Sequence, residues 1–126
     1  MVGKKLGEGK FGCVYLANHR LLGGVYALKK IPKNLIKSHL MTDQLALEIR
    51  LQSCLHHHNI LGMYGFFEDS LHLYIVLEYM DGGTLYSKLK KAGKLEPEEA
   101  AFIIKQIATA IDYLHDLGIA HRDLKP

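Results

Sequence analysis

Residues 7–14 read Gly7-Glu8-Gly9-Lys10-Phe11-Gly12-Cys13-Val14, and this stretch decides between two folds. It matches the pattern G-x-G-x-x-G-x-V, in which glycines let the backbone turn tightly and approach a phosphate with no Cβ in the way. The loop of a dinucleotide-binding fold leads into a helix. This loop instead leads into Val14-Tyr15-Leu16-Ala17, a run typical of a strand. The motif therefore disfavours a dinucleotide-binding module, and an ordinary glycine-rich hairpin stays open as an alternative.

The segments around this loop form an ordered series of predicted strands and helices. Residues 2–30 read as strands with a hairpin tip at Gly23-Gly24, and residues 60–66 and 71–79 read as two more strands. Helices are predicted over 40–55, from Thr84 to about Ala92, and over 97–117. Thr84 is the expected N-cap, Pro97 fits a first helical turn, and Gly118 is the expected stop. This order is α+β, with helices gathered toward the end, and not that of a doubly wound sheet.

The two longer helices carry apolar stripes that predict their buried faces. In an amphipathic helix, apolar residues recur at spacings of three and four. The predicted stripes are Leu40, Leu45, Leu47, Leu51 and Leu55 in the first helix, and Phe102, Ile103, Ile107, Ala110, Ile111 and Leu114 in the last.

The composition is that of a globular chain and excludes several functional classes. Of the 126 residues, 48% are hydrophobic and 23% are charged, and the net charge is +3. The basic residues are spread along the chain, so we expect no nucleic-acid partner. No apolar run is long enough for a membrane span and no secretory signal is visible, so we expect no membrane partner. Two cysteines, Cys13 and Cys54, predict neither a disulfide framework nor a cysteine zinc site, and indicate a cytoplasmic or nuclear protein.

Three consecutive histidines, His56-His57-His58, raise the question of a metal site. Successive side chains point in different directions on a helix or a strand, so the three cannot all face one ion. We therefore predict no metal site among these residues.

A lysine and a glutamate form the next candidate constellation. In Val25-Tyr26-Ala27-Leu28-Lys29, alternate residues of a strand share one face, so Ala27 leaves room for a flat base where Lys29 meets phosphate oxygens. A lysine in a cleft needs a counter-charge, and Glu48 on the predicted helix 40–55 is the expected partner, lying toward its apolar face. Taken alone, a solvent-exposed lysine and a surface glutamate are the common alternatives.

The most specific motif is the string His121-Arg122-Asp123-Leu124-Lys125-Pro126. Asp123 would accept a hydrogen bond from a substrate hydroxyl and orient it, and Lys125 would neutralise charge on a transferred phosphoryl group. His121 and Arg122 would be structural. A merely charged turn after a helix fits the composition but not this string in this place.

Taken in order, the four motifs resemble the catalytic domain of eukaryotic serine/threonine protein kinases, over essentially the whole chain. The resemblance implies a protein-kinase-like α+β fold. Residues 1–80 would form a complete small lobe, an antiparallel sheet plus the αC helix, with the hinge; residues 81–126 would begin the large lobe with its first helices. It also implies phosphoryl transfer from ATP to Ser/Thr hydroxyls of proteins, with ATP and magnesium as cofactors. Lys125 resembles the serine/threonine branch.

The resemblance also implies roles within a nucleotide site. Leu77 matches the gatekeeper, and Glu78-Tyr79-Met80 match the hinge, whose backbone binds adenine. The implied cofactor-binding residues are Leu6, Gly7, Gly9, Lys10, Phe11, Gly12, Val14, Ala27, Lys29, Leu77, Glu78, Tyr79 and Met80, and the implied catalytic residues are Asp123, Lys125, Lys29 and Glu48.

A finer resemblance is to the Aurora-like kinases. Gln52 lies one turn after Glu48, where most kinases carry an apolar residue and Aurora-type kinases carry glutamine. His58 departs from the pattern, because the family usually has proline there. The other matching stretches are Gly9-Lys10-Phe11-Gly12, His57-His58-Asn59-Ile60-Leu61, Tyr64-Gly65 and Leu77-Glu78-Tyr79.

The family's magnesium ligands, an asparagine of the catalytic loop and the D-F-G aspartate, would lie beyond Pro126. We therefore expect a fragment of a complete kinase that is inactive by itself, with ATP and a protein substrate as partners of the whole. The alternative is a genuine short product that binds nucleotide, or a regulatory protein on the small lobe, without catalysis.

Overall fold

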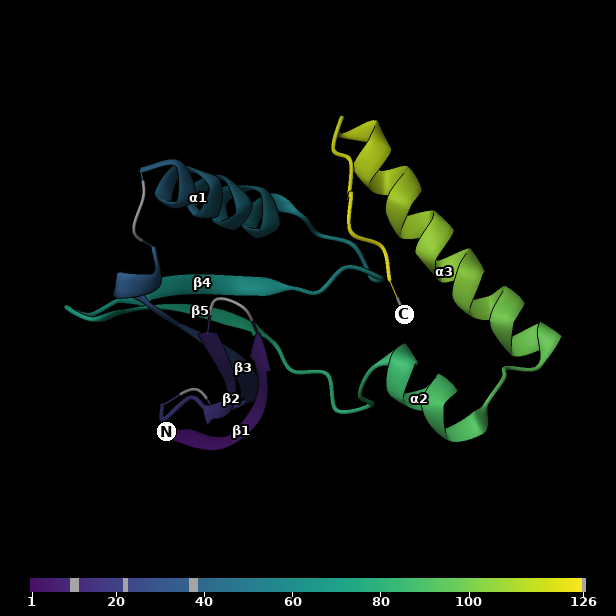
Figure 1. The fold of residues 1–126 in the computed structure, drawn as a ribbon, viewed down its shortest axis with the longest axis horizontal. Coiled ribbons are helices and arrows are strands. Elements are labelled where there is room, and N and C mark those ends of the chain that lie inside the picture. Colours follow the sequence, from purple (N-terminus) through teal and green to yellow (C-terminus); the bar gives the residue numbers. More distant parts are fainter. Residues whose placement is uncertain (10–11, 22, 37–38, 126) are drawn as a thin grey trace. The chain divides into compact units, whose positions relative to one another are not determined.

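The computed structural model describes residues 1–9, 12–21, 23–36 and 39–125, with the backbone alone at residues 39 and 40. These residues fall into two compact units, Met1–His56 with Leu61–Tyr79, and His57–Ile60 with Met80–Pro126. Figure 1 shows the elements in chain order: β1 (Val2–Gly9), β2 (Gly12–Asn18), β3 (Val25–Pro32), η1 (Lys33–Leu35), α1 (His39–Cys54), β4 (Met63–Glu68), β5 (His72–Glu78), α2 (Leu85–Ala92) and α3 (Pro97–Asp116). The predicted α+β order is confirmed.

The first unit is built on one antiparallel sheet with the strand order β1-β2-β3-β5-β4. The glycine-rich stretch joins β1 to β2, and Gly12 begins a strand rather than a helix. A dinucleotide-binding module is therefore excluded, because its glycine loop opens a helix. Gly23 and Gly24 both have positive φ, 69° and 88°, between β2 and β3, as expected at the predicted hairpin tip.

The register of the sheet determines which side chains share a face. Directly opposed residues of antiparallel strands point to the same side. Val14 of β2 lies opposite Lys29 of β3, which in turn lies opposite Ile75 of β5. In the neighbouring row, Ala27 lies opposite Leu77. Both rows belong to the face that carries the core.

The core of this unit closes where α1 packs on that face (Figure 1). Ile31 of β3, Ile49 of α1 and Ile75 of β5 meet there, and Ile31 is only 1% exposed. Partly buried residues extend the cluster: Ile36, Leu45, Met63, Leu73 and Leu77. Since burying one such side chain stabilises by roughly 1.5–3 kcal/mol, this cluster holds α1 against the sheet.

The predicted stripe of α1 is partly wrong. Ile49, which the leucine pattern leaves out, is the buried residue, whereas Leu47 is 56% exposed and Leu51 is also exposed. Each residue turns about 100° around a helix, so Leu45 and Ile49 share a face while Leu47 points to the opposite side. The pattern was ambiguous because leucines occur on several sides of this helix.

The strand predictions differ from the structure mainly at β4. The prediction over 60–66 begins too early, because Ile60 N–H donates to the His57 carbonyl in a turn, at 3.1 Å. β4 therefore runs over Met63–Glu68. The prediction over 71–79 lies within one residue of β5 at both ends.

The second unit contains α2 and α3, whose ends confirm the expected signals. The Thr84 hydroxyl accepts the Ser87 N–H at 3.1 Å, and Pro97 is at the start of α3. Beyond α3, Gly118 has a φ of 72°, and the Ile119 N–H donates to the Leu114 carbonyl at 2.8 Å. These bonds satisfy groups that a helix end leaves without intrahelical partners.

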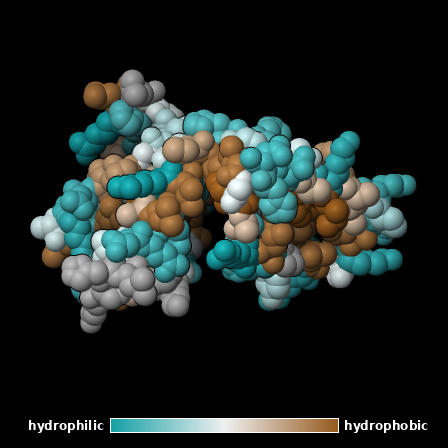
Figure 2. Space-filling model, turned by 90° about the horizontal axis from the view of Figure 1, so that it is seen from above, coloured by the Kyte–Doolittle hydropathy of each residue, from teal (hydrophilic) through white to brown (hydrophobic). Residues whose placement is uncertain are grey.

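The predicted stripe of α3 is confirmed at its centre and wrong at Phe102. Ala110 and Leu114 are buried, and Ile103 and Ile107 are half-buried. Phe102 is 65% exposed, as is the neighbouring Ile104 to 63%. Both lie about 100° to either side of Ile103, off the buried line. Figure 2 shows that apolar residues lie on the surface of the molecule among polar ones.

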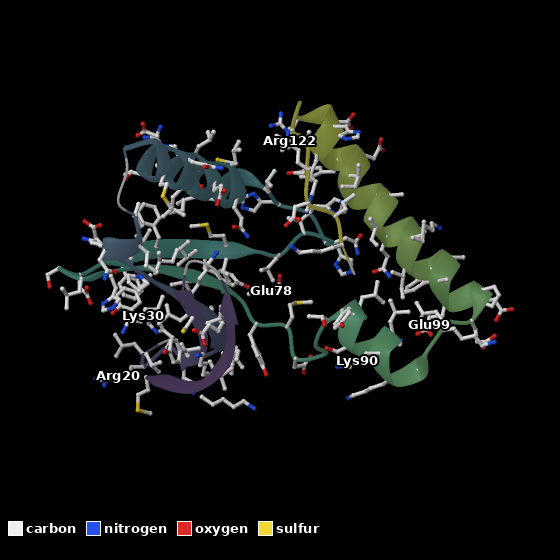
Figure 3. All side chains as sticks on the ribbon, in the orientation of Figure 1. Arg20, Lys30, Glu78, Lys90, Glu99 and Arg122 are labelled. Atoms are coloured by element: carbon white, nitrogen blue, oxygen red, sulfur yellow. The ribbon has the colours of Figure 1, made fainter. Side chains whose placement is uncertain are left out.

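Polar and ring contacts also hold the second unit together, in addition to the apolar stripe of α3. The loop 57–60 is fastened to α3 by the Asn59 side-chain N–H, which donates to Gln106 Oε1 at 2.9 Å, and by the His57 ring stacked on Tyr113 at 5.0 Å. Lys88 of α2 forms an ion pair with Glu99 of α3, and Glu99 is labelled in Figure 3. No helix in the described part of the chain is long and apolar enough to cross a membrane.

Candidate nucleotide site and catalytic loop

The glycine-rich hairpin sets the first part of the candidate site. Gly7 lies opposite Val14, and Gly9 lies opposite Gly12 at the tip. Lys10 and Phe11 lie outside the described residues. Gly12 is required by the fold itself, because a Cβ there would lie 2.0 Å from the Lys30 carbonyl oxygen. A Cβ on Gly7 or Gly9 would meet no described atom within 4 Å.

The strand register aligns residues of this hairpin with a residue of β3, so that they form one row across three strands. Gly7, Val14 and Lys29 follow one another on the same face of β1, β2 and β3. Ala27, buried at the centre of β3, and Leu77 of β5 form the adjoining row. The structure therefore brings a glycine-rich turn, a cation and a flat apolar surface together on one side of the sheet.

Lys29 and Glu48 line the same cavity between β3 and α1. Its volume is about 90 Å³, and its other lining residues are Ile31, Ile36, Met41, Gln44 and Leu45. Among the ion pairs of the described residues, none joins Lys29 to Glu48 within 4.0 Å. Glu48 is exposed overall, but it lines this cavity together with Leu45, so it lies at the edge of the apolar face of α1. At about 100° per residue, Glu48 is roughly 60° around the helix from Leu45 and roughly 100° from the buried Ile49.

Gln44 is a polar residue of this cavity that the motifs did not reveal. It lies four residues before Glu48, and residues at that spacing share a helix face. The four-residue spacing between Gln44 and Glu48 was therefore the one signal in the sequence that could have identified Gln44. Its amide offers both donors and an acceptor to the charged groups around it.

The remaining nucleotide-site residues lie at strand ends and beyond. Leu6 of β1 is exposed, and Tyr79 follows β5 with its side chain half-buried. Glu78, labelled in Figure 3, is the last residue of β5. Met80 is exposed and belongs to the second unit.

The catalytic-loop motif follows α3 in the second unit. The Asp123 carboxylate accepts a hydrogen bond from Lys125 Nζ at 2.7 Å, and the Asp123 N–H donates to His121 Nδ1 at 3.2 Å. The Lys125 ammonium lowers the pKa of Asp123 below its usual 3.8, so the carboxylate is ionised at neutral pH. Arg122 has a φ of 62°, an uncommon conformation for a non-glycine residue. His121 and Arg122 thus shape the turn that presents Asp123.

The described residues contain no group of three or more His, Cys, Asp and Glu side chains that could hold a metal ion. The cationic and glycine-rich groups instead suit an anionic ligand. Lys29 and the glycine turn lie on one face of the sheet, next to the apolar row of Ala27 and Leu77.

Comparison with known proteins agrees with this geometry. The sequence model of the protein kinase domain matches residues 1–126, and the chain therefore belongs to the protein kinase family. Over 125 residues, 99% of the chain, it is 42% identical to the Aurora kinase of Schizosaccharomyces pombe, 41% to Aurora kinase A-B of Xenopus laevis and 40% to Aurora kinase C of Mus musculus. The aligned part covers 35%, 31% and 45% of these relatives, so the chain spans less than half of their length. The resemblance to Aurora-like kinases is confirmed.

Proposed function

We propose that the protein carrying this chain transfers the γ-phosphoryl group of ATP to serine and threonine hydroxyls of proteins. The observation that carries the proposal is the row of Gly7, Val14 and Lys29 on one sheet face. Glycine at positions 7 and 9 is not demanded by contact with described atoms, and close approach of phosphate oxygens supplies a reason for it. We retain the division into a small lobe with hinge, 1–80, and the start of a large lobe, 81–126.

In this proposal the small lobe with its hinge, residues 1–80, binds the nucleotide. The backbone of the glycine turn and the Lys29 ammonium contact the phosphates, and we propose the same for Lys10 and Phe11. Leu6, Val14, Ala27 and Leu77 enclose the base, and Glu78, Tyr79 and Met80 bind its edge through the backbone. Glu48 orients Lys29 once α1 brings the two within ion-pair distance. Magnesium, when bound with ATP, supplies further neutralisation of phosphate charge.

The second unit supplies the groups that act on the hydroxyl. Ionised Asp123 accepts the hydrogen bond of a serine or threonine O–H and takes its proton as the oxygen attacks the γ-phosphorus. A new P–O bond forms while the bond to the β–γ bridging oxygen breaks, and ADP leaves. Lys125, at 2.7 Å from Asp123, neutralises charge on the phosphoryl oxygens.

The test is phosphate transfer to a generic serine-rich protein by the protein as its gene encodes it. Lys29→Met should lower the rate at least about a hundredfold, because the lost cation faces developing phosphate charge. The matched control is Lys30→Met. Lys30 is the next residue of β3, lies opposite Cys13 and Tyr74 on the other face, and should be dispensable. Equal rates for the two variants would refute the assignment of Lys29.

A second candidate is a regulatory protein bound to the first unit. A groove of about 450 Å³ lies between α1 and the β4–β5 hairpin, with Leu45, Ile49 and Phe66 in its wall and Arg50 among its charged lining residues. A partner with an apolar anchor and an acidic neighbour would suit it. Ala46→Arg, which places a charge in this wall, should abolish binding of such a partner, whereas Ala108→Arg on α3 should not.

The cysteines bear on the cellular compartment of either function. Cys13 and Cys54 are both free thiols, which supports a reducing compartment, the cytoplasm or the nucleus.

If the 126-residue chain acts by itself, its expected activity is nucleotide binding without phosphate transfer. Measurable ATP affinity with a cooperative melt and no phosphate transfer would support that reading.

A further inference from the structure

The sheet carries a second apolar surface on the face opposite α1. Successive residues of a strand point to opposite faces, so Leu28 of β3 faces away from the core side that holds Lys29. Leu28 is paired with Val76 of β5 and shares its face. In the neighbouring row, Ala17 of β2 is paired with Tyr26. All four side chains line a groove of about 560 Å³, a volume typical of sites for small ligands.

The composition of this face differs from that of an ordinary solvated sheet face. Antiparallel sheets with one face on the core usually present polar residues on the other. Here each strand contributes an apolar residue to the groove: Val2 of β1, Ala17 of β2, Leu28 of β3, Val76 of β5 and Phe67 of β4. Val2 is 62% exposed and Phe67 is 51% exposed, so the groove is open to solvent on two sides. Apolar surface of this kind marks a candidate binding site.

The polar part of the groove lies at one end. Apart from the Tyr26 hydroxyl, the polar lining side chains are the consecutive Asn18, His19 and Arg20, where β2 enters the turn to β3. Arg20, labelled in Figure 3, is exposed and takes part in none of the ion pairs of the described residues. Among the described lining residues there is also no acidic side chain. An anionic group is therefore the complement of this end.

The floor of the groove suits an alkyl chain better than an extended peptide. β2, β3 and β5 are interior strands, so their backbone groups pair with neighbouring strands. An extended peptide lying across them would leave its own N–H and C=O groups without partners. An alkyl chain has no such groups, and each methylene that it buries contributes to binding. One charged end and a long apolar body are what this arrangement accommodates.

We propose that this groove binds a long-chain carboxylate, namely a free fatty acid. The Arg20 guanidinium donates hydrogen bonds to the carboxylate, and the alkyl chain lies over Leu28 and Val76 toward Phe67. The site is on the face of the sheet opposite Lys29. It is therefore separate from the proposed nucleotide site, and the proposal does not rest on ATP binding.

The probe is dodecanoate below its micelle concentration, titrated by calorimetry into the protein as its gene encodes it. One molecule should bind per chain, and decanoate should bind about tenfold more weakly because it buries two fewer methylenes. Dodecyltrimethylammonium has the same chain with the opposite head charge and should also bind at least about tenfold more weakly. Methyl NMR signals of Leu28 and Val76 should shift while that of Ile49 stays in place. Equal affinity for the two head groups would overturn the proposal.

Arg20→Gln tests the head-group contact at an exposed position, where the fold does not depend on the side chain. Dodecanoate should bind about tenfold more weakly, as loss of a charge-assisted hydrogen bond predicts. The matched control is Arg50→Gln, the same change in the groove between α1 and the β4–β5 hairpin, which should leave the affinity at its parent value. A loss in Arg50→Gln but not in Arg20→Gln would place the ligand in that other groove and overturn the proposal, as would absence of dodecanoate binding.

Discussion

The first unit, which is built on the sheet, and the second unit, which contains α2 and α3, bury their apolar residues to different degrees. They are called here the sheet unit and the helical unit. In the sheet unit, Ile31, Ile49 and Ile75 come from three elements and meet in one cluster. In the helical unit, the buried line of α3 centres on Ala110 and Leu114, while Phe102 and Ile104 of the same helix are exposed. The difference teaches that the groups proposed to bind nucleotide stand on a well-packed scaffold. The proposed base, Asp123, stands on an exposed loop ordered by local polar contacts.

The largest expected effect comes from opening the core of the sheet unit. Ile31→Ala removes a 1% exposed side chain and should lower the free energy of unfolding of that unit by about 2–5 kcal/mol. Urea titration followed by hydrogen exchange of the β3 and β5 amides measures this. The control is Ile104→Ala, the same change at a 63% exposed site, expected within about 0.5 kcal/mol of the parent. Similar losses in both variants would contradict the contrast between the units.

A smaller effect is expected in the helical unit from loss of the α2 cap. Thr84→Ala removes the hydroxyl that accepts the Ser87 N–H and should cost about 1 kcal/mol, because that N–H has no intrahelical partner. Exchange of the α2 amides should quicken while the sheet amides stay unchanged. Thr84→Ser keeps the acceptor and should match the parent. Faster exchange in the sheet as well would show that the units are not separate in stability.

The next prediction concerns pH and the β4–β5 turn. Two backbone N–H groups, those of Leu71 and His72, and the Tyr74 hydroxyl lower the pKa of Asp69 from 3.8 to about 2. A lowered folded-state pKa means that Asp69 stabilises the turn above pH 3.8 and loses this contribution as the pH falls toward 2. Asp69→Asn keeps an acceptor but does not titrate. Urea midpoints between pH 5 and 2 should therefore fall more steeply for the parent than for Asp69→Asn, and parallel slopes would refute the assignment.

The smallest effect is expected at the exposed apolar surface of α3. Phe102→Gln replaces a 65% exposed ring with a good helix former, so stability should change by less than about 0.5 kcal/mol. Association should decrease, because exposed apolar patches promote it. Light scattering at rising concentration, with Ala110→Gln as the buried counterpart, checks both points. A large loss of stability in Phe102→Gln would show that the ring is packed after all.

Much of the fold was predictable because its signals are local. Thr84, Pro97 and Gly118 mark helix ends through bonds to nearby backbone groups. The strand after Gly12, which excluded a dinucleotide-binding module, is visible in adjacent residues. The errors fell where the choice depends on distant partners. The leucine stripe predicted for α1 left out Ile49, and contact with Ile31 and Ile75 is what buries Ile49.

The candidate site likewise has residues that local sequence motifs identify and a cavity that depends on packing. The motifs pointed to Lys29 and Asp123 from the type and spacing of their neighbours alone. The cavity shared by Lys29, Gln44 and Glu48 depends on how α1 lies on β3, and the separation of the two charges depends on that packing too. Whether Lys10 and Phe11 contact nucleotide stays a prediction.

The sequence by itself determined the class of this protein, since glycine spacing, strand alternation and the string from His121 to Lys125 are properties of neighbouring residues. Tertiary structure alone decided which charged and polar groups meet. Gly62 and Glu78 are distant in the chain, and only strand pairing places the N–H of one beside the carboxylate of the other. Such contacts depend on the packing of whole elements, and no local pattern encodes them.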